Sequence, residues 1–101
     1  IQKFRNYVKS LPLEAYDFHN LDDIGSNDCE CVDSFHGGDV TYQKILLKIV
    51  EHNPDTVLKP YLNIDLMKEM VKKFEGHAYT VYDPSKYNYK EVDFLNLGCH
   101  K

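Results

Sequence analysis

The chain changes character within residues 33–50, which read DSFHGGDVTYQKILLKIV. Its first six letters are polar, aromatic or glycine, whereas the rest carries apolar residues at the spacing of an amphipathic helix. The apolar face comprises Val40, Tyr42, Ile45, Leu46, Ile49 and Val50, and the side assigned to solvent comprises Gln43, Lys44, Lys48 and Glu51. Asp39 is suited to cap this helix, and Asn53-Pro54 ends it. The stretch therefore predicts a polar loop that leads directly into a helix.

Upstream, the sequence predicts a helix, a short strand and a long loop. The apolar residues Ile1, Phe4, Val8 and Leu11 recur at helical spacing. Pro12 closes that helix, and residues 13–18 suit a strand in a sheet interior. Residues 19–38 are rich in Asp, Ser, Asn and Gly, and long loops inside compact domains are often functional. The order helix, strand, loop, helix is typical of the late part of an α/β domain.

Downstream, a further helix and a tail are expected. Asn63 can cap a helix whose apolar stripe contains Ile64, Met67, Val71 and Phe74, and Gly76 supplies its stop. Residues 77–101 are rich in tyrosine and contain only short strand-like pieces, near 78–82 and 92–97. We therefore expect residues 1–76 to belong to one α/β domain and residues 77–101 to wrap over it.

Composition excludes some classes of function. The 101 residues carry a net charge of −4, whereas binding a nucleic-acid backbone needs a concentrated basic surface. No apolar run approaches the roughly 20 residues that span a bilayer. The sequence starts at Ile1 rather than at methionine, which fits a processed product as well as a fragment of a longer protein.

The three cysteines leave two interpretations open. Cys29, Cys31 and Cys99 are an odd number, which does not suggest a complete disulfide framework. Either they are free thiols that pack as small apolar residues, or Cys99 forms a bridge to the loop in an exported protein.

Asp33 and His36 are the residues in the loop best suited to chemistry. An Asp three residues before a His can turn back and accept the imidazole Nδ1 proton, which leaves Nε2 free as a general base. Gly37 and Gly38 keep the surroundings small and flexible, so that another part of the protein can approach His36. The alternative is an Asp/His pair that only caps a loop or a helix start, and the spacing by itself favours this alternative.

The segment from Leu13 to Val50, and above all Asp33-Ser34-Phe35-His36-Gly37-Gly38, resembles the last conserved block of SGNH/GDSL hydrolases. It looks most like the DltD-type proteins of D-alanyl-lipoteichoic acid synthesis and related polysaccharide O-acyltransferases. The resemblance implies the C-terminal part of a three-layer α/β fold, with His36 as general base and Asp33 as its orienting group. It implies no cofactor and no metal.

The resemblance also implies a parent protein that is anchored in a membrane, faces outward and transfers D-alanyl or acetyl groups to teichoic acid or polysaccharide. Its partners would be a cell-envelope polymer or acyl carrier and the remainder of the domain, which carries the nucleophilic serine. The Gly-Asp-Ser block and the oxyanion-hole blocks of the family are not recognisable here. Ser26 and Ser34 lie in the same loop as His36, so we expect this chain alone to be inactive.

Two other functions compete with this one. The first is a metal-stabilised loop, for which potential ligands are His19, Asp22, Asp23, Asp28, Cys29, Cys31, Asp33, His36 and Asp39, although no recognised zinc or calcium spacing occurs. The second is a non-enzymatic module that binds glycans or proteins through Tyr79, Tyr82, Tyr87 and Tyr89. For these tyrosines the alternative is that they cover the domain's own core.

Overall fold

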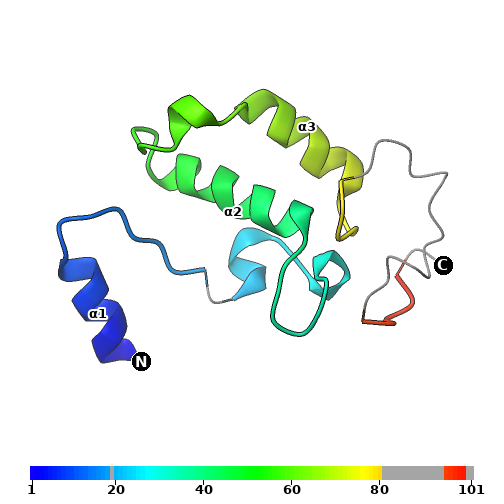
Figure 1. Cartoon of the computed structure of the whole chain (residues 1–101), viewed down its shortest axis with the longest axis horizontal. Coiled ribbons are helices and arrows are strands. Elements are labelled where there is room, and N and C mark those ends of the chain that lie inside the picture. The colour runs from blue at the N-terminus through cyan, green and yellow to red at the C-terminus, as the bar shows by residue number, and fades with distance from the viewer. Residues whose placement is uncertain (19, 81–94, 100–101) are drawn as a thin grey trace.

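The structure, a computed structural model, describes residues 1–18, 20–80 and 95–99, and in these ranges its regular elements are all helical (Figure 1). The α-helices are α1 (Gln2–Ser10), α2 (Asp39–His52) and α3 (Ile64–Phe74). Short 3-10 turns are η1 (Leu21–Ile24), η2 (Asp28–Glu30) and η3 (Lys59–Tyr61). Helices α2 and α3 lie side by side and run in opposite directions, whereas α1 lies apart from them (Figure 1).

The predicted three-layer α/β fold is wrong. The described residues contain no strand, and the only pairing of strand type among them is an isolated antiparallel bridge between Cys31 and Gly37. Residues 13–18 were expected to be a strand, but a strand needs a neighbour with free backbone groups, and here the neighbour is the turn-rich connection between α2 and α3. Residues 78–80 and 95–97 form no strand either. The rest of the two strand-like pieces lies outside the described residues.

A side chain, rather than a β-ladder, holds residues 13–18 in place. The Glu14 carboxylate accepts hydrogen bonds from Thr56 Oγ1 at 2.8 Å and from Asn53 Nδ2 and Val57 N, each at 3.1 Å. Asn53 Nδ2 also donates to the Tyr16 hydroxyl at 3.1 Å. These six residues fit a segment that crosses a surface without strand pairing as well as they fit a strand, which explains why the two were not distinguished.

The predicted helices are confirmed, with one change at a cap. Asn63 caps α3, because its Oδ1 accepts from Leu66 N at 3.1 Å. Gly38, and not Asp39, is the N-cap residue of α2. Asp39 is the first helical residue, and its carboxylate accepts from the backbone N of Thr80 at 3.2 Å and from the Thr80 hydroxyl at 3.3 Å.

Few apolar side chains are buried among residues 1–18, 20–80 and 95–99. They are Ile24, Cys31, Val40, Ile49, Phe74, Ala78 and Cys99, and none belongs to α1. Polar side chains are buried beside them, among which Glu30 is completely buried and Lys44 is 7% exposed. The placement of Lys44 on the solvent side of α2 is therefore wrong. Lys44 lies four residues after Val40, so the two side chains share a face of the helix.

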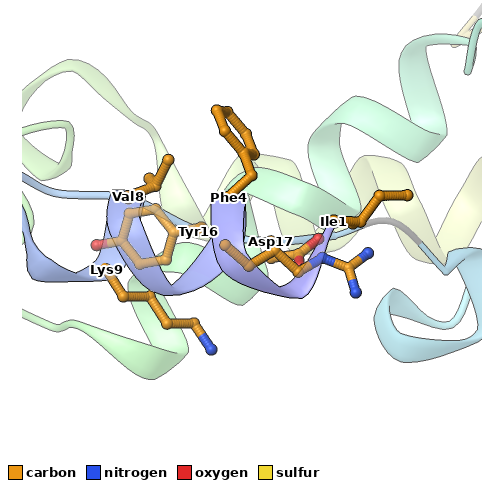
Figure 2. Close-up of a pocket in the computed structure, with 8 residues that line it drawn as sticks. Ile1, Phe4, Val8, Lys9, Tyr16 and Asp17 are labelled. Carbon is orange, nitrogen blue, oxygen red and sulfur yellow. The ribbon is translucent and has the colours of Figure 1, made fainter.

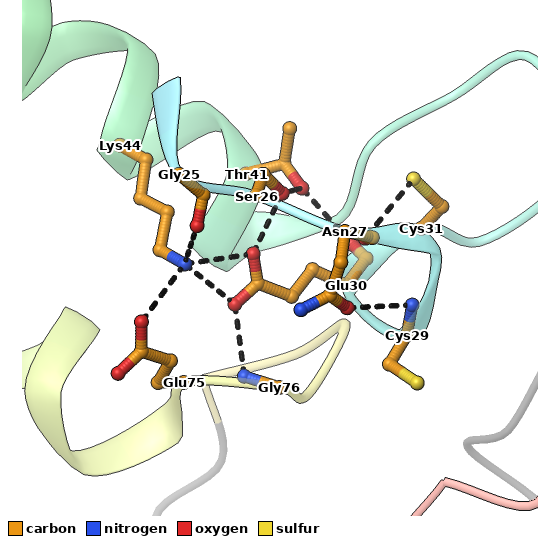
Figure 3. A network of polar contacts seen from close by, with 10 residues as sticks. All are labelled: Gly25, Ser26, Asn27, Cys29, Glu30, Cys31, Thr41, Lys44, Glu75 and Gly76. Carbon is orange, nitrogen blue, oxygen red and sulfur yellow. Dashed lines mark hydrogen bonds and ion pairs between the residues drawn. The ribbon is translucent and has the colours of Figure 1, made fainter. Parts of the chain in front are cut away.

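Glu30 and Lys44 form the centre of a buried polar network (Figure 3). Lys44 Nζ lies 2.9 Å from both carboxylate oxygens of Glu30. The Ser26 hydroxyl donates to Glu30 Oε1 at 2.6 Å, and the backbone N of Gly76 donates to Glu30 Oε2 at 2.8 Å. Every buried charge needs such partners, because desolvation is otherwise not compensated. The carboxylate thus joins η2 to α2 and to the residues after α3.

A disulfide gives the second long-range connection. Cys29 in η2 is bonded to Cys99, 70 residues away, with a Cα–Cα distance of 6.0 Å. Of the two alternatives for the cysteines, the structure has the bridge from Cys99 to the loop, and Cys31 is a buried free thiol. Closing a loop of this length stabilises a fold by about 4 kcal/mol in the chain-entropy model.

Replacing Glu30 by alanine removes the carboxylate that lies 2.9 Å from the Lys44 ammonium, which keeps only the Gly25 carbonyl at 2.7 Å and the largely exposed Glu75 carboxylate at 3.4 Å. We expect Glu30→Ala to lower the free energy of unfolding by about 3–5 kcal/mol, measured by urea denaturation followed by circular dichroism. The matched control is Glu51→Ala, since the Glu51 side chain is 68% exposed and lies 3.4 Å from Lys48 in a surface ion pair. This control should change the free energy by less than about 1 kcal/mol. Equal losses in the two variants would contradict the central role of Glu30.

Candidate active site

The loop that carries Asp33 and His36 is closed at its base by backbone hydrogen bonds. The carbonyl of Glu30 accepts from Gly38 N at 2.8 Å, and the carbonyl of His36 accepts from Val32 N at 3.0 Å. The antiparallel bridge described above lies between these two bonds. Residues 32–36 therefore form a short turn whose two ends are fixed between η2 and the first residue of α2.

The two glycines after His36 allow close packing rather than flexibility. A Cβ on Gly38 would lie 2.8 Å from the Glu30 carbonyl oxygen and would collide with the Ala78 carbonyl oxygen. A Cβ on Gly37 would lie 2.6 Å from the Thr41 Cγ2 methyl group. We predicted that the two glycines keep the approach to His36 flexible. The structure gives a steric reason instead, because the backbones of Glu30, Gly38 and Ala78 lie too close together for a side chain at position 38.

Within the turn, Asp33 organises the backbone and the imidazole at once. Its Oδ1 accepts from the backbone N of Phe35 and from that of His36, both at 2.7 Å. His36 Nδ1 lies 2.9 Å from Oδ1 and 2.8 Å from Oδ2 of Asp33. An ionised carboxylate only accepts, so Nδ1 must carry the proton and the neutral ring presents an unprotonated Nε2. The structure thus brings the two predicted residues together in the orientation of an Asp-His pair.

The pair lies at the surface. The side chain of His36 is 66% exposed and that of Asp33 is 50% exposed. The pKa of Asp33 is lowered, first by the hydrogen bond from Phe35 N and then by the His36 side chain. Asp33 is therefore ionised over the whole neutral range, as a group that holds His36 in one tautomer must be.

A hollow with a mainly apolar lining lies away from the Asp-His pair. It measures about 340 Å³ and lies between α1 and the segment that follows (Figure 2), and its lining residues are Ile1, Phe4, Arg5, Val8, Lys9, Ala15, Tyr16 and Asp17. Arg5 Nε forms an ion pair with Asp17 Oδ2 at 2.7 Å on its wall. Neither Asp33 nor His36 lines this hollow, so it contributes nothing to the candidate site.

The serines and the free cysteine beside the pair are poor nucleophiles. The Ser26 hydroxyl is 3% exposed, donates to Glu30 and lies 2.8 Å from Thr41 Oγ1. Ser34 is exposed in the turn itself, and in the part of the chain that the structure describes no serine hydroxyl is hydrogen-bonded to His36. The pKa of Cys31 is raised, chiefly by burial and then by nearby carboxylates, so its thiol stays protonated.

The described residues give no support to the two competing sites, the metal-stabilised loop and the tyrosine surface. In residues 1–18, 20–80 and 95–99, no three His, Cys, Asp or Glu side chains gather as metal ligands, and Cys29 is already in the disulfide. His19 lies outside the described residues. So do Tyr82, Tyr87 and Tyr89 of the predicted tyrosine surface, of which only the partly exposed Tyr79 is described.

Glu30, the residue that connects the Asp33–His36 loop to the buried polar network, was not identified from the sequence. Its carbonyl closes the loop and its carboxylate binds Lys44. One signal was present: a lysine four residues after a valine on the buried face of a helix needs an acidic partner if it is not to point to solvent.

Removing the imidazole should change the titration of Asp33. A lowered pKa in the fold means that this carboxylate stabilises the turn above its unfolded pKa of about 3.9, and that the stabilisation is lost as the pH falls through the folded pKa. We expect His36→Ala to raise the Asp33 pKa only part of the way, because the Phe35 hydrogen bond remains. Side-chain carboxyl NMR of the two proteins measures this. An unchanged Asp33 pKa would mean that the imidazole does not bind the carboxylate.

Comparisons of the chain with protein-family models, with curated proteins and with solved structures found no match. No relative therefore contributes evidence on activity, substrate or partner. What bears on function is the geometry of Asp33 and His36, together with the resemblance of their loop to the last conserved block of SGNH/GDSL hydrolases.

Proposed function

We propose that this chain supplies the general base and its orienting carboxylate to a serine-dependent acyl-transfer site. One observation carries the proposal: Asp33 holds His36 Nδ1 at 2.8–2.9 Å while fixing the turn through two backbone hydrogen bonds. A pair that only capped a loop would need the backbone bonds alone. The proposal rests on this pair and not on an α/β fold.

The chemistry follows from the tautomer. As a serine oxygen attacks the carbonyl carbon of an ester or thioester, its proton passes to His36 Nε2. The imidazolium so formed is stabilised by the Asp33 carboxylate, which stays ionised. The same proton then passes to the leaving oxygen or sulfur, and an acceptor hydroxyl or water attacks the acyl-serine in a second, equivalent cycle. The serine in this proposal comes from outside the described residues.

The substrate class is inferred from the loop's resemblance to DltD-type proteins and polysaccharide O-acyltransferases. It is transfer of D-alanyl or acetyl groups to teichoic acid or another cell-envelope polysaccharide. The disulfide between Cys29 and Cys99 supports a location outside the cytoplasm, where such bonds persist. The membrane anchor implied by the resemblance is part of the same proposal. Among the described residues, no helix has both the length and the apolar character that crossing a membrane requires.

The test uses the natural full-length protein, made in its own cells and purified. We expect its active serine to react with a fluorophosphonate probe, and we expect His36→Ala and Asp33→Asn to lower the rate of acyl transfer by roughly 10³–10⁴-fold. His52→Ala is the matched control, since His52 is exposed in the last turn of α2, and should leave the rate unchanged.

The isolated 101 residues should not hydrolyse p-nitrophenyl acetate above the buffer rate. Turnover by this chain that disappears in Ser34→Ala would place the nucleophile inside the turn and contradict the proposal. Full activity of the His36→Ala full-length protein would contradict it as well.

A further inference from the structure

Thr41, the third residue of α2, is buried beside the turn that carries Asp33 and His36. Its side chain is 2% exposed and contacts the chain on both flanks of that turn. Its hydroxyl lies 3.2 Å from the Glu30 carbonyl oxygen, which precedes the turn. Its Cγ2 methyl group occupies the space that a side chain on Gly37, directly after His36, would need. Through this one side chain, α2 meets both sides of the turn.

The hydroxyl of Thr41 has two partners and one proton (Figure 3). Ser26 Oγ lies 2.8 Å away, and Ser26 gives its own proton to Glu30 Oε1 at 2.6 Å. The Thr41 proton is therefore shared between the Ser26 oxygen and the Glu30 carbonyl oxygen in a three-centre hydrogen bond. The same carbonyl accepts from Gly38 N at 2.8 Å, the bond that closes the loop. The hydroxyl thereby connects the buried polar network to the base of the turn.

The methyl group of Thr41 acts by contact alone. A Cβ built on Gly37 would lie 2.6 Å from Thr41 Cγ2 and 2.8 Å from Thr41 Cβ, so the backbone of Gly37 rests against this side chain. Protein interiors are close-packed, and a deleted methyl group leaves a gap that its neighbours close only in part. Among the described residues, the hydrogen bonds of the Asp33 side chain all stay within residues 33–36. The position of the turn relative to α2 therefore needs a separate contact.

We propose that Thr41 is a positioning residue for the acyl-transfer site, and that its methyl group sets where His36 Nε2 lies relative to α2. This inference rests on the proposed function. Asp33 decides how the imidazole is oriented within the turn, and Thr41 decides where the whole turn lies. Proton transfer requires the serine oxygen within about 3 Å of Nε2, and a displacement of about 1 Å can lower a rate about 100-fold. A displaced turn would keep its Asp-His pair and lose most of its rate.

The test removes the methyl group and keeps the hydroxyl. In the natural full-length protein, we expect Thr41→Ser to lower kcat for acyl transfer roughly 10–100-fold and to change KM by less than about twofold. In the 101-residue chain, His36 should keep its tautomer, whereas the residual dipolar couplings of the amides of residues 32–37 should change relative to those of α2. The matched control is Thr56→Ser, which should leave kcat unchanged. Thr56 is also 2% exposed, but it lies beyond the C-terminal end of α2 and donates to Glu14.

A double-mutant cycle tests the contact itself. Gly37→Ala introduces the Cβ that would lie 2.6 Å from the Thr41 methyl group, so it should displace the turn and lower kcat as well. Removing that methyl group makes part of the room for the new Cβ. The combination of Gly37→Ala with Thr41→Ser should therefore lose less than the product of the two single losses. Gly37→Ala combined with Thr56→Ser should lose the full product.

The outcomes separate this inference from the proposed function. If His36→Ala abolishes acyl transfer, but Thr41→Ser lowers kcat no more than Thr56→Ser does, the proposed function stands and this inference fails. Independent effects at positions 37 and 41 would overturn it too. So would a changed His36 tautomer in Thr41→Ser, because the methyl group would then act within the Asp-His pair. If His36→Ala leaves acyl transfer intact, both fail.

Discussion

The buried ion pair of Glu30 and Lys44 is the constraint on which the rest of the structure depends. A fully buried carboxylate is tolerated only when its charge and all its acceptor sites are satisfied. Here four hydrogen bonds satisfy it, and they come from residues before η2, from α2 and from the segment after α3. Because few apolar side chains are buried in the part of the chain that the structure describes, these polar bonds decide how the three segments meet. The pair therefore contributes specificity of arrangement as well as stability.

The candidate site is built directly on this pair. The side chain of Glu30 is fixed by the network, and its carbonyl accepts the bond that closes the loop at Gly38. The close approach of backbone at Gly38 leaves no room for a side chain, so loop and helix start are held in one relation. Asp33 then has only to accept the backbone hydrogen bonds within the short turn of residues 32–36. The exposed imidazole of His36 is consequently held by a chain of contacts that starts in the core.

Local patterns predicted the local features well. Apolar spacing located α2 and α3, the Asn63 cap was correct, and the structure has the contact between Asp33 and His36 that their three-residue spacing allows. The errors concern partners distant in sequence. Residues 13–18 find no strand to pair with in the described part of the chain, so strand-like residue types alone could not decide the fold class. Lys44 was assigned to solvent because its partner comes from a loop without periodicity. The role of the pair in catalysis stays a prediction.

The most direct test is the tautomer of His36, read from long-range ¹H–¹⁵N correlations in the folded chain at a pH where the ring is neutral. The structure predicts that Nδ1 carries the proton, held by Asp33, and that Nε2 shows the shift of an unprotonated nitrogen. A ring protonated at Nε2, or one that exchanges freely between both tautomers, would contradict the account, because such a ring could not serve as an oriented general base.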